Sequence, residues 1–133
     1  MTNTNYVLNS RKEAVPEPDA VKFSVWYGMA LRQGKLRVGM TVVGDTYVST
    51  VFTGIDCNFK AWSWDNDPGT APVLWSSTIF DRDKTVDETR CSGSWEDAKR
   101  MHRKMVETAK ARFPSFWARL RARLRSFLHD AIH

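Results

Sequence analysis

Alternating apolar and polar residues predict two strands early in the chain. Apolar side chains stand at every second position between Lys22 and Met29, and again between Leu36 and Val43. This period of two is typical of strands with one buried face. Gly34 lies between the two segments and can take the positive φ of a tight turn. The pattern therefore predicts a first hairpin made of residues 22–29 and 36–43.

Two more strands are predicted further along the chain. Residues 46–55 are rich in Val, Thr and aromatic residues on both faces, as in an interior strand. Residues 73–80 give the fourth strand after a loop at 56–72. The segment 81–93 is polar and turn-rich, with room for a short edge strand near Glu88–Cys91.

The hydrophobic period changes to that of a helix at Ser94. Ser94 is a suitable N-cap, and Glu96 and Asp97 in the first turn favour the positive end of the helix dipole. Pro114 ends or kinks this helix, because proline cannot donate a backbone hydrogen bond. The apolar stripe that we expect to pack on the sheet comprises Trp95, Ala98, His102, Met105, Val106, Ala109 and Phe113.

A second helix is predicted over residues 115–131. Its apolar arc is flanked by arginines on both edges. Such a helix suits packing on its own domain, contact with nucleic acid or an acidic protein, or attachment to an anionic membrane surface. The arc comprises Phe116, Trp117, Leu120, Leu124, Phe127, Leu128 and Ala131.

Together these elements predict an α+β fold. We expect a four-stranded antiparallel sheet in meander order followed by two helices, the first of them packed on the sheet. The chain would divide into a flexible N-terminal arm (1–20), an α+β domain (21–112) and a basic amphipathic C-terminal helix (113–133). A chain of 133 residues suffices for one ordinary domain and not for two.

Composition indicates a globular cytoplasmic protein. Hydrophobic residues make up 42% and charged residues 26% of the chain, which excludes a disordered composition. The polar N-terminus lacks the apolar core of a signal peptide, and no stretch approaches the roughly 20 apolar residues of a membrane span. Without an export signal, Cys57 and Cys91 are expected to stay reduced.

The net charge of +5 is unevenly distributed. Residues 1–97 carry ten Lys/Arg against thirteen Asp/Glu, whereas residues 98–133 carry ten against two. A basic end on a slightly acidic body favours an acidic partner, either nucleic acid or an acidic protein surface, with a solvated helix face as the alternative. The predicted contact residues are Lys99, Arg100, Arg103, Lys104, Arg119, Arg121, Arg123 and Arg125.

Six tryptophans are a high number for this length. Trp62 and Trp64 differ from the others because they lie in the long predicted loop. An exposed loop tryptophan can anchor a protein partner or stack on a base, and the alternative is a loop folded over the sheet edge. We predict Trp62 and Trp64 as a protein-partner loop.

Catalytic and metal-binding motifs are absent from the sequence. His129 and His133 have the spacing of a helical zinc pair but lack a third ligand and the usual glutamate. His102 lies in the predicted apolar stripe, where a packed, hydrogen-bonded histidine is commoner than a catalytic one. The acidic residues near Asp81 do not have the spacing of a calcium loop. We therefore expect no metal, no cofactor and a binding protein, with a small enzyme that uses His102 as the alternative.

One stretch resembles a known family. Val48–Asp56, Asn58–Phe59, Pro72–Trp75 and Ile79–Asp81, followed by Trp95, Ala98, His102, Met105 and Val106, are similar to the signature VSTVFLGLDH…PxLWETMVF…R…A…H..MV. That signature belongs to an uncharacterised family of small phage, prophage and bacterial proteins. The similarity covers roughly residues 37–108, and Cys57 replaces the histidine that the family usually carries after the aspartate.

The resemblance implies a phage-associated accessory protein in the host-cell cytoplasm. Small proteins of that kind often bind host machinery or nucleic acid. The leading hypothesis is therefore a non-enzymatic protein whose basic C-terminal helices contact nucleic acid or an acidic protein. The alternative is an inhibitor of a host defence protein, such as an anti-CRISPR-like protein, that acts by docking.

Overall fold

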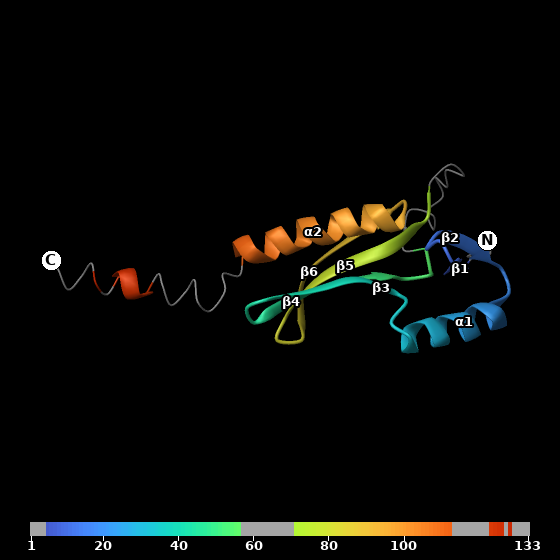
Figure 1. Cartoon of the computed structure of the whole chain (residues 1–133), viewed down its shortest axis with the longest axis horizontal. Helices are drawn as coiled ribbons and strands as arrows, with labels where there is room; N and C mark the ends of the chain where they lie inside the picture. The colour runs from blue at the N-terminus through green and yellow to red at the C-terminus, as the bar shows by residue number, and fades with distance from the viewer. Residues whose placement is uncertain (1–4, 57–70, 113–122, 127, 129–133) are drawn as a thin grey trace, which may run out of the picture.

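The fold is a four-stranded sheet with one helix on its face and a hairpin–helix unit at its end (Figure 1). The structure is a computed structural model that describes residues 5–56, 71–112, 123–126 and 128. Its elements are β1 (Asn5–Leu8), β2 (Ala14–Glu17), α1 (Ala20–Arg32), β3 (Arg37–Val43), β4 (Thr46–Phe52), β5 (Val73–Asp81), β6 (Lys84–Ser92) and α2 (Trp95–Arg112).

The predicted fold class is confirmed. Strands β3, β4, β5 and β6 are antiparallel neighbours in chain order, which is a meander, and α2 packs on one face of this sheet. The strands predicted at 36–43, 46–55 and 73–80 correspond to β3, β4 and β5. Two-residue connections join β3 to β4 and β5 to β6 as hairpins, whereas residues 53–72 lie between β4 and β5.

The strand predicted at residues 22–29 is wrong, because this segment lies in helix α1. The Asp19 carboxylate accepts hydrogen bonds from the backbone N–H groups of Val21 (2.9 Å) and Lys22 (3.1 Å) and so caps the helix. Apolar residues at 23, 26, 27 and 30 also satisfy a helical period, and Phe23 and Ala30 are buried. The local apolar pattern fits both structures, and the helix is favoured by the Asp19 cap together with the burial of Phe23 and Ala30.

The hairpin predicted around Gly34 is therefore also wrong. Gly34 has φ +70° but terminates α1 instead of joining two strands. Lys35 N–H donates to the Ala30 carbonyl (2.9 Å) and Gly34 N–H to the Leu31 carbonyl (3.3 Å), the pair of bonds that defines a Schellman C-cap. The same left-handed glycine serves a turn or a helix end equally well.

The arm predicted at residues 1–20 contains an ordered hairpin. Strands β1 and β2 pair antiparallel with Leu8 opposite Ala14. Tyr6 N–H donates to the Gly54 carbonyl (2.8 Å), and Asn5 bridges Ile55, so the hairpin is joined to the chain just after β4. Four-residue strands carry too little alternation for detection from the sequence.

The short edge strand predicted near Glu88–Cys91 is longer than expected. Strand β6 spans Lys84–Ser92 and pairs with β5 through a tight turn in which Arg82 and Asp83 have φ of 51° and 68°. Most of its side chains are exposed and polar. An edge strand of this kind lacks the apolar alternation by which strands are recognised.

The helix predicted from Ser94 is confirmed as α2. Ser94 N–H donates to Asp97 Oδ2 (2.8 Å), and Asp97 N–H donates to Ser94 Oγ (3.3 Å), which is a reciprocal capping box. The predicted stripe faces the sheet, and its most buried members are Ala98, Met105, Val106 and Ala109. Phe113 lies outside the described residues, and Met101 joins the buried face.

Most of the predicted second helix lies outside the described residues. Residues 123–126 and 128 are helical, and all five are exposed. Leu124 and Leu128 of the predicted apolar arc are 52% and 57% exposed. Within the part of the chain that is described, no helix is long and apolar enough to cross a membrane.

Candidate functional site

A cleft opens where the β1–β2 hairpin, the end of α1 and the beginnings of β3 and α2 meet. Its volume is about 450 Å³, within the range of small-molecule sites. The hairpin loop forms one wall, the C-cap of α1 another, and the first residue of α2 the third. The lining residues are Leu8, Asn9, Ser10, Lys12, Trp26, Gly34, Lys35, Arg37 and Trp95.

The charge of this cleft has one sign. Lys12, Lys35 and Arg37 all line it, and the described residues of its lining include no aspartate or glutamate. All three residues are exposed. Positive charges that surround a concave surface raise the local concentration of anions. We refer to this Lys12–Lys35–Arg37 cleft as the cationic cleft.

Two indole rings complete the cationic cleft. Trp95 packs edge-on against the buried Trp75, with ring centroids 5.7 Å apart, and Trp26 packs edge-on against Phe52 at 6.2 Å. Both indoles are half-buried. Lys12 Nζ lies 4.5 Å from the centroid of a Trp95 ring, a cation–π contact. The cleft therefore offers flat apolar surfaces next to positive charge.

The Trp95 indole also has an unused donor. Its Nε1–H is buried and, among the described residues, meets no hydrogen-bond acceptor. A buried donor without a partner costs free energy comparable to a lost hydrogen bond, about 1–3 kcal/mol. Trp75 differs, because its Nε1–H donates to the Gly93 carbonyl (2.9 Å).

The hairpin loop that carries Lys12 has a fixed shape. Asn9 Oδ1 accepts hydrogen bonds from Arg11 N–H and Glu13 N–H, both at 2.9 Å. Lys12 has φ +62°, a left-handed conformation that glycine adopts at lower cost. The loop thus places a long cationic side chain at a position where the backbone alone would favour glycine.

A second cleft of about 420 Å³ lies against the first and shares Lys12 and Trp95 with it. Its lining adds Arg11 and Lys99, but also Glu13 and Glu96. The carboxylates offset the cations, so this cleft is less suited to an anion. It connects the cationic cleft to the first turns of α2.

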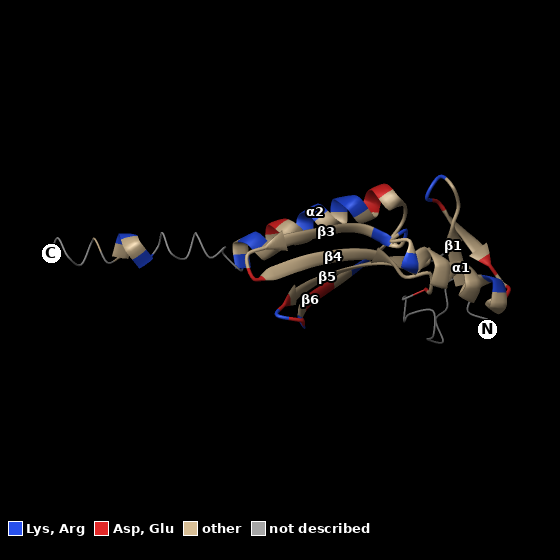
Figure 2. Cartoon of the chain, turned by 60° about the horizontal axis from the view of Figure 1, so that its bottom comes forward, with Lys and Arg blue, Asp and Glu red and all other residues tan. Residues whose placement is uncertain are grey.

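The predicted basic residues on α2 are exposed, and carboxylates neutralise part of their charge. Lys99 Nζ lies 3.5 Å from Glu96 Oε1, and Arg100 forms an ion pair with Asp97. Arg103 and Lys104 are exposed, and no ion pair within the described part of the chain involves them. Blue and red therefore alternate along α2 in Figure 2.

The remaining predicted site residues fall in other places. Arg123 and Arg125 are helical and exposed. Arg119, Arg121, Trp62 and Trp64 lie outside the described residues, as do His129 and His133. The charged residues of the cationic cleft were not predicted as a site, because they lie in segments predicted as an arm, a turn and a strand. A lysine whose backbone adopts the left-handed conformation, such as Lys12, cannot be recognised from a single sequence.

His102 is packed and hydrogen-bonded, as predicted. Its Nε2 lies 2.9 Å from Thr41 Oγ1 and its Nδ1 2.7 Å from Thr50 Oγ1, which in turn lies 2.7 Å from Ser77 Oγ. Burial lowers the pKa of His102, because desolvation disfavours the imidazolium. The ring thus joins α2 to β3, β4 and β5.

The described surroundings of His102 give the enzyme hypothesis no support. A catalytic histidine needs access to a substrate. Neither cleft described above is lined by His102, and its hydrogen-bond partners are threonine hydroxyls, not carboxylates. Burial also raises the pKa of the Cys91 thiol, which lowers its reactivity at neutral pH.

Among the described residues, no three His, Cys, Asp or Glu side chains are grouped so that they could hold a metal ion. Comparisons with protein-family models, with curated proteins and with solved structures give no match for this chain.

Proposed function

We propose that this chain is a non-enzymatic accessory protein that binds nucleic acid, with a nucleotide unit held in the cationic cleft. The observation that carries the proposal is a cleft whose described lining residues include three cations and two indoles and no carboxylate. Cations suit the phosphates, and indole faces suit the bases. The phage association remains what the sequence resemblance implies.

The aromatic content favours nucleic acid over an acidic protein surface. An acidic protein surface would need only the cations, which bind its carboxylates. A nucleic acid could also stack a base on the flat rings of Trp26 and Trp95. Stacking on an aromatic side chain contributes about 1–3 kcal/mol per base. Since bases are accessible only when unpaired, single strands should bind more tightly than duplexes.

The exposed cations of α2 extend the same surface. Lys99 lines the cleft next to the cationic cleft and shares this lining with Lys12. Arg103 and Lys104 follow on the same helix and are exposed. A strand anchored in the cationic cleft would therefore pass Lys99 before it reaches Arg103 and Lys104.

The test is the salt dependence of binding to a fluorescently labelled single strand, measured by anisotropy. Three phosphate contacts predict a slope of about −2 for log Kobs against log [salt], which is about a 20-fold loss between 50 and 200 mM salt. Contacts to Lys99, Arg103 and Lys104 in addition would double the slope and raise the loss to about 300-fold. The slope of log Kobs against log [salt] thus gives the number of phosphate contacts.

The decisive variant combines Lys12→Gly, Lys35→Ser and Arg37→Ser. Glycine is chosen at position 12 because φ there is +62°. We expect at least a 10-fold loss of affinity at low salt and a shallower slope. Lys84→Ser, an exposed position at the β5–β6 turn, is the control and should bind like the wild type. Absence of wild-type binding at about 50 mM salt, or equal binding by the triple variant, would refute the proposal.

A second candidate function is docking onto a protein, as in the inhibitor hypothesis. The outer side of α1 favours it, because Val21, Val25 and Met29 recur every four residues and are 71%, 58% and 53% exposed. An exposed apolar stripe is typical of interaction surfaces. A complex with a host protein that persists at high salt and is lost in Val25→Lys would support this candidate over nucleic-acid binding.

A further inference from the structure

The polar side chains that line the cationic cleft can all donate hydrogen bonds. They are Asn9, Ser10, Lys12, Lys35 and Arg37. Asn9 Oδ1 accepts two backbone N–H groups at 2.9 Å, so the other end of this side chain is the Nδ2 amide, which only donates. The Ser10 hydroxyl can donate as well. Such a lining matches a ligand that combines negative charge with several acceptor oxygens.

Two of the three cations are held next to each other by the core. Lys35 and Arg37 flank Leu36, which is only 4% exposed. The Leu36 carbonyl accepts a hydrogen bond from Phe52 N–H (2.8 Å), which ties this segment to the end of β4. Burial of Leu36 therefore fixes the chain between the two cations, and both of them line the cleft.

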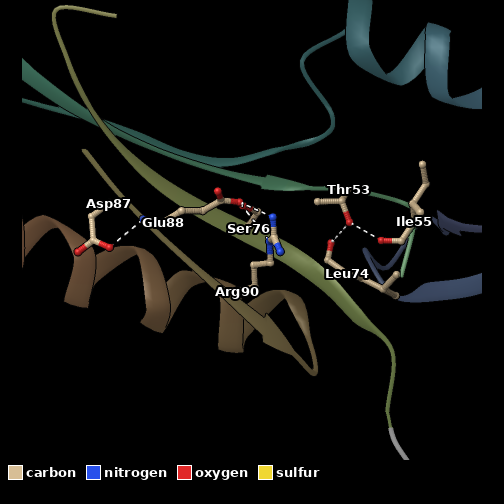
Figure 3. A network of polar contacts seen from close by, with 7 residues as sticks. All are labelled: Thr53, Ile55, Leu74, Ser76, Asp87, Glu88 and Arg90. Carbon is tan, nitrogen blue, oxygen red and sulfur yellow. Dashed lines mark hydrogen bonds and ion pairs between the residues drawn. The ribbon is translucent and has the colours of Figure 1, made fainter. Parts of the chain in front are cut away.

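The hairpin that carries Lys12 is also anchored to the sheet. Strand β1 is bonded to Gly54 and bridges Ile55, just after β4. That segment is itself fixed, because the Thr53 hydroxyl donates to the carbonyls of Ile55 (2.9 Å) and Leu74 (3.0 Å), as Figure 3 shows. Binding groups on anchored segments lose less free energy to ordering when a ligand binds. The backbone that carries the three cations is therefore largely preformed.

The charge of the cleft exceeds that of one internal phosphate. Lys12, Lys35 and Arg37 supply three positive charges, whereas a phosphodiester inside a strand carries one negative charge. A terminal phosphate monoester carries about −1.5 to −2 at neutral pH and presents three acceptor oxygens. Together with the next phosphodiester it brings about −2.5 to −3, which matches the three cations.

The walls of the cationic cleft also suit the end of a strand. The hairpin loop, the C-cap of α1 and the start of α2 surround it. The second cleft, which shares Lys12 and Trp95, continues it towards α2. An internal nucleotide needs a path for the chain on both sides, whereas a terminal nucleotide needs one path only. The two clefts together therefore suit a terminal nucleotide followed by its neighbour.

We propose that the cationic cleft binds the phosphorylated end of a single strand, a terminal phosphate monoester, in preference to an internal phosphodiester. This inference rests on the proposed nucleic-acid binding and adds the part of the strand that is recognised. The monoester lies among Lys12, Lys35 and Arg37, with the terminal base against the indoles. From there the strand crosses the second cleft and passes Lys99.

The test is competition for a labelled single strand, followed by anisotropy at about 50 mM salt. The competitors are unlabelled strands of one sequence, about ten nucleotides long, that carry a 5′-phosphate, a 3′-phosphate, a 5′-methylphosphate or no terminal phosphate. One of the two monoesters should bind at least about 10-fold more tightly than the unphosphorylated strand, because it adds charge-assisted hydrogen bonds. The tighter monoester identifies the end. The methylphosphate carries a single charge and should lose most of this gain.

Variants separate recognition of the end from general attraction. Lys35→Ser and Arg37→Ser, each tested alone, should reduce the preference for the monoester at least about 3-fold. Lys104→Ser is the matched control, because Lys104 is an exposed cation of α2 that does not line the cationic cleft. It should weaken phosphorylated and unphosphorylated strands by the same factor. All three positions are exposed, so no variant should lower the melting temperature by much.

The outcomes distinguish this inference from the proposed function. Equal binding by all four strands would overturn the inference and leave the proposed function, which requires only that single strands bind. A preference that survives both Lys35→Ser and Arg37→Ser would overturn it too, because the end would then bind elsewhere. Displacement by free adenosine monophosphate as effective as that by the phosphorylated strand would assign the cleft to a small ligand instead. Absence of binding by every strand would refute the proposed function and this inference with it.

Discussion

Substitutions at Gly39 and His102 are predicted to have coupled effects on the free energy of unfolding, because the two residues are in contact. A Cβ atom added at Gly39 would lie 3.0 Å from His102 Cδ2 and Nε2 and 3.2 Å from Cε1. The ring cannot retreat without breaking its hydrogen bonds to Thr41 and Thr50. Gly39→Ala should therefore destabilise the fold by about 1–3 kcal/mol, as overpacking of a well-packed interior does.

The sign of this effect should reverse when the ring is removed. In a His102→Ser background the added methyl group has space, and alanine in a strand is about 0.5–1 kcal/mol more favourable than glycine. The single change His102→Ser should itself cost about 1–3 kcal/mol, because the threonine hydroxyls lose their partner. The double variant should therefore be at least as stable as His102→Ser alone, a coupling of about 1.5–4 kcal/mol between the two positions.

Urea denaturation of the four proteins, followed by far-UV circular dichroism, measures the coupling as a double-mutant cycle. Equal m-values across the set are the control for two-state unfolding. If Gly39→Ala costs the same with and without the ring, or if it stabilises the wild type, then the contact with the His102 ring does not explain the glycine.

Two further predictions concern the same fold. The pKa of His102 in the folded state lies below its unfolded value of 6.5, so the unfolded chain binds the extra proton first. The melting temperature should therefore fall as the pH drops through 6.5 towards the folded-state pKa. This step should be absent in His102→Asn. Asp19→Ala should cost about 1 kcal/mol through loss of the α1 cap, measurable by urea denaturation, whereas Asp45→Ala, with no such cap, should cost less.

Local patterns were sufficient for the sheet interior and for α2. Strands β3, β4 and β5 alternate strongly, and α2 combines a helical period with a cap at Ser94. The residues that form the cap lie within four positions of each other, and so do successive residues of the stripe. The sequence alone therefore predicts both features. His102 was also placed correctly, because its position in the stripe fixes which face it occupies.

The segment now seen as α1 could not be assigned from its own pattern. Apolar residues at 23, 25, 27 and 29 satisfy a strand, and those at 23, 26, 27 and 30 a helix. The hairpin and the chain after β4 supply the surface that buries Phe23, and this contact selects the helical face. Tertiary packing overrides an ambiguous local preference.

The sequence by itself determined the α+β class, the meander of the central strands, the cap and stripe of α2, and the packed state of His102. Only the tertiary structure brought Lys12, Lys35 and Arg37 together with Trp26 and Trp95. The physical reason is the separation along the chain over which each kind of interaction acts. Period and capping act between neighbours along the chain, whereas a cleft depends on which distant elements pack together, and a single sequence does not encode that in any local pattern.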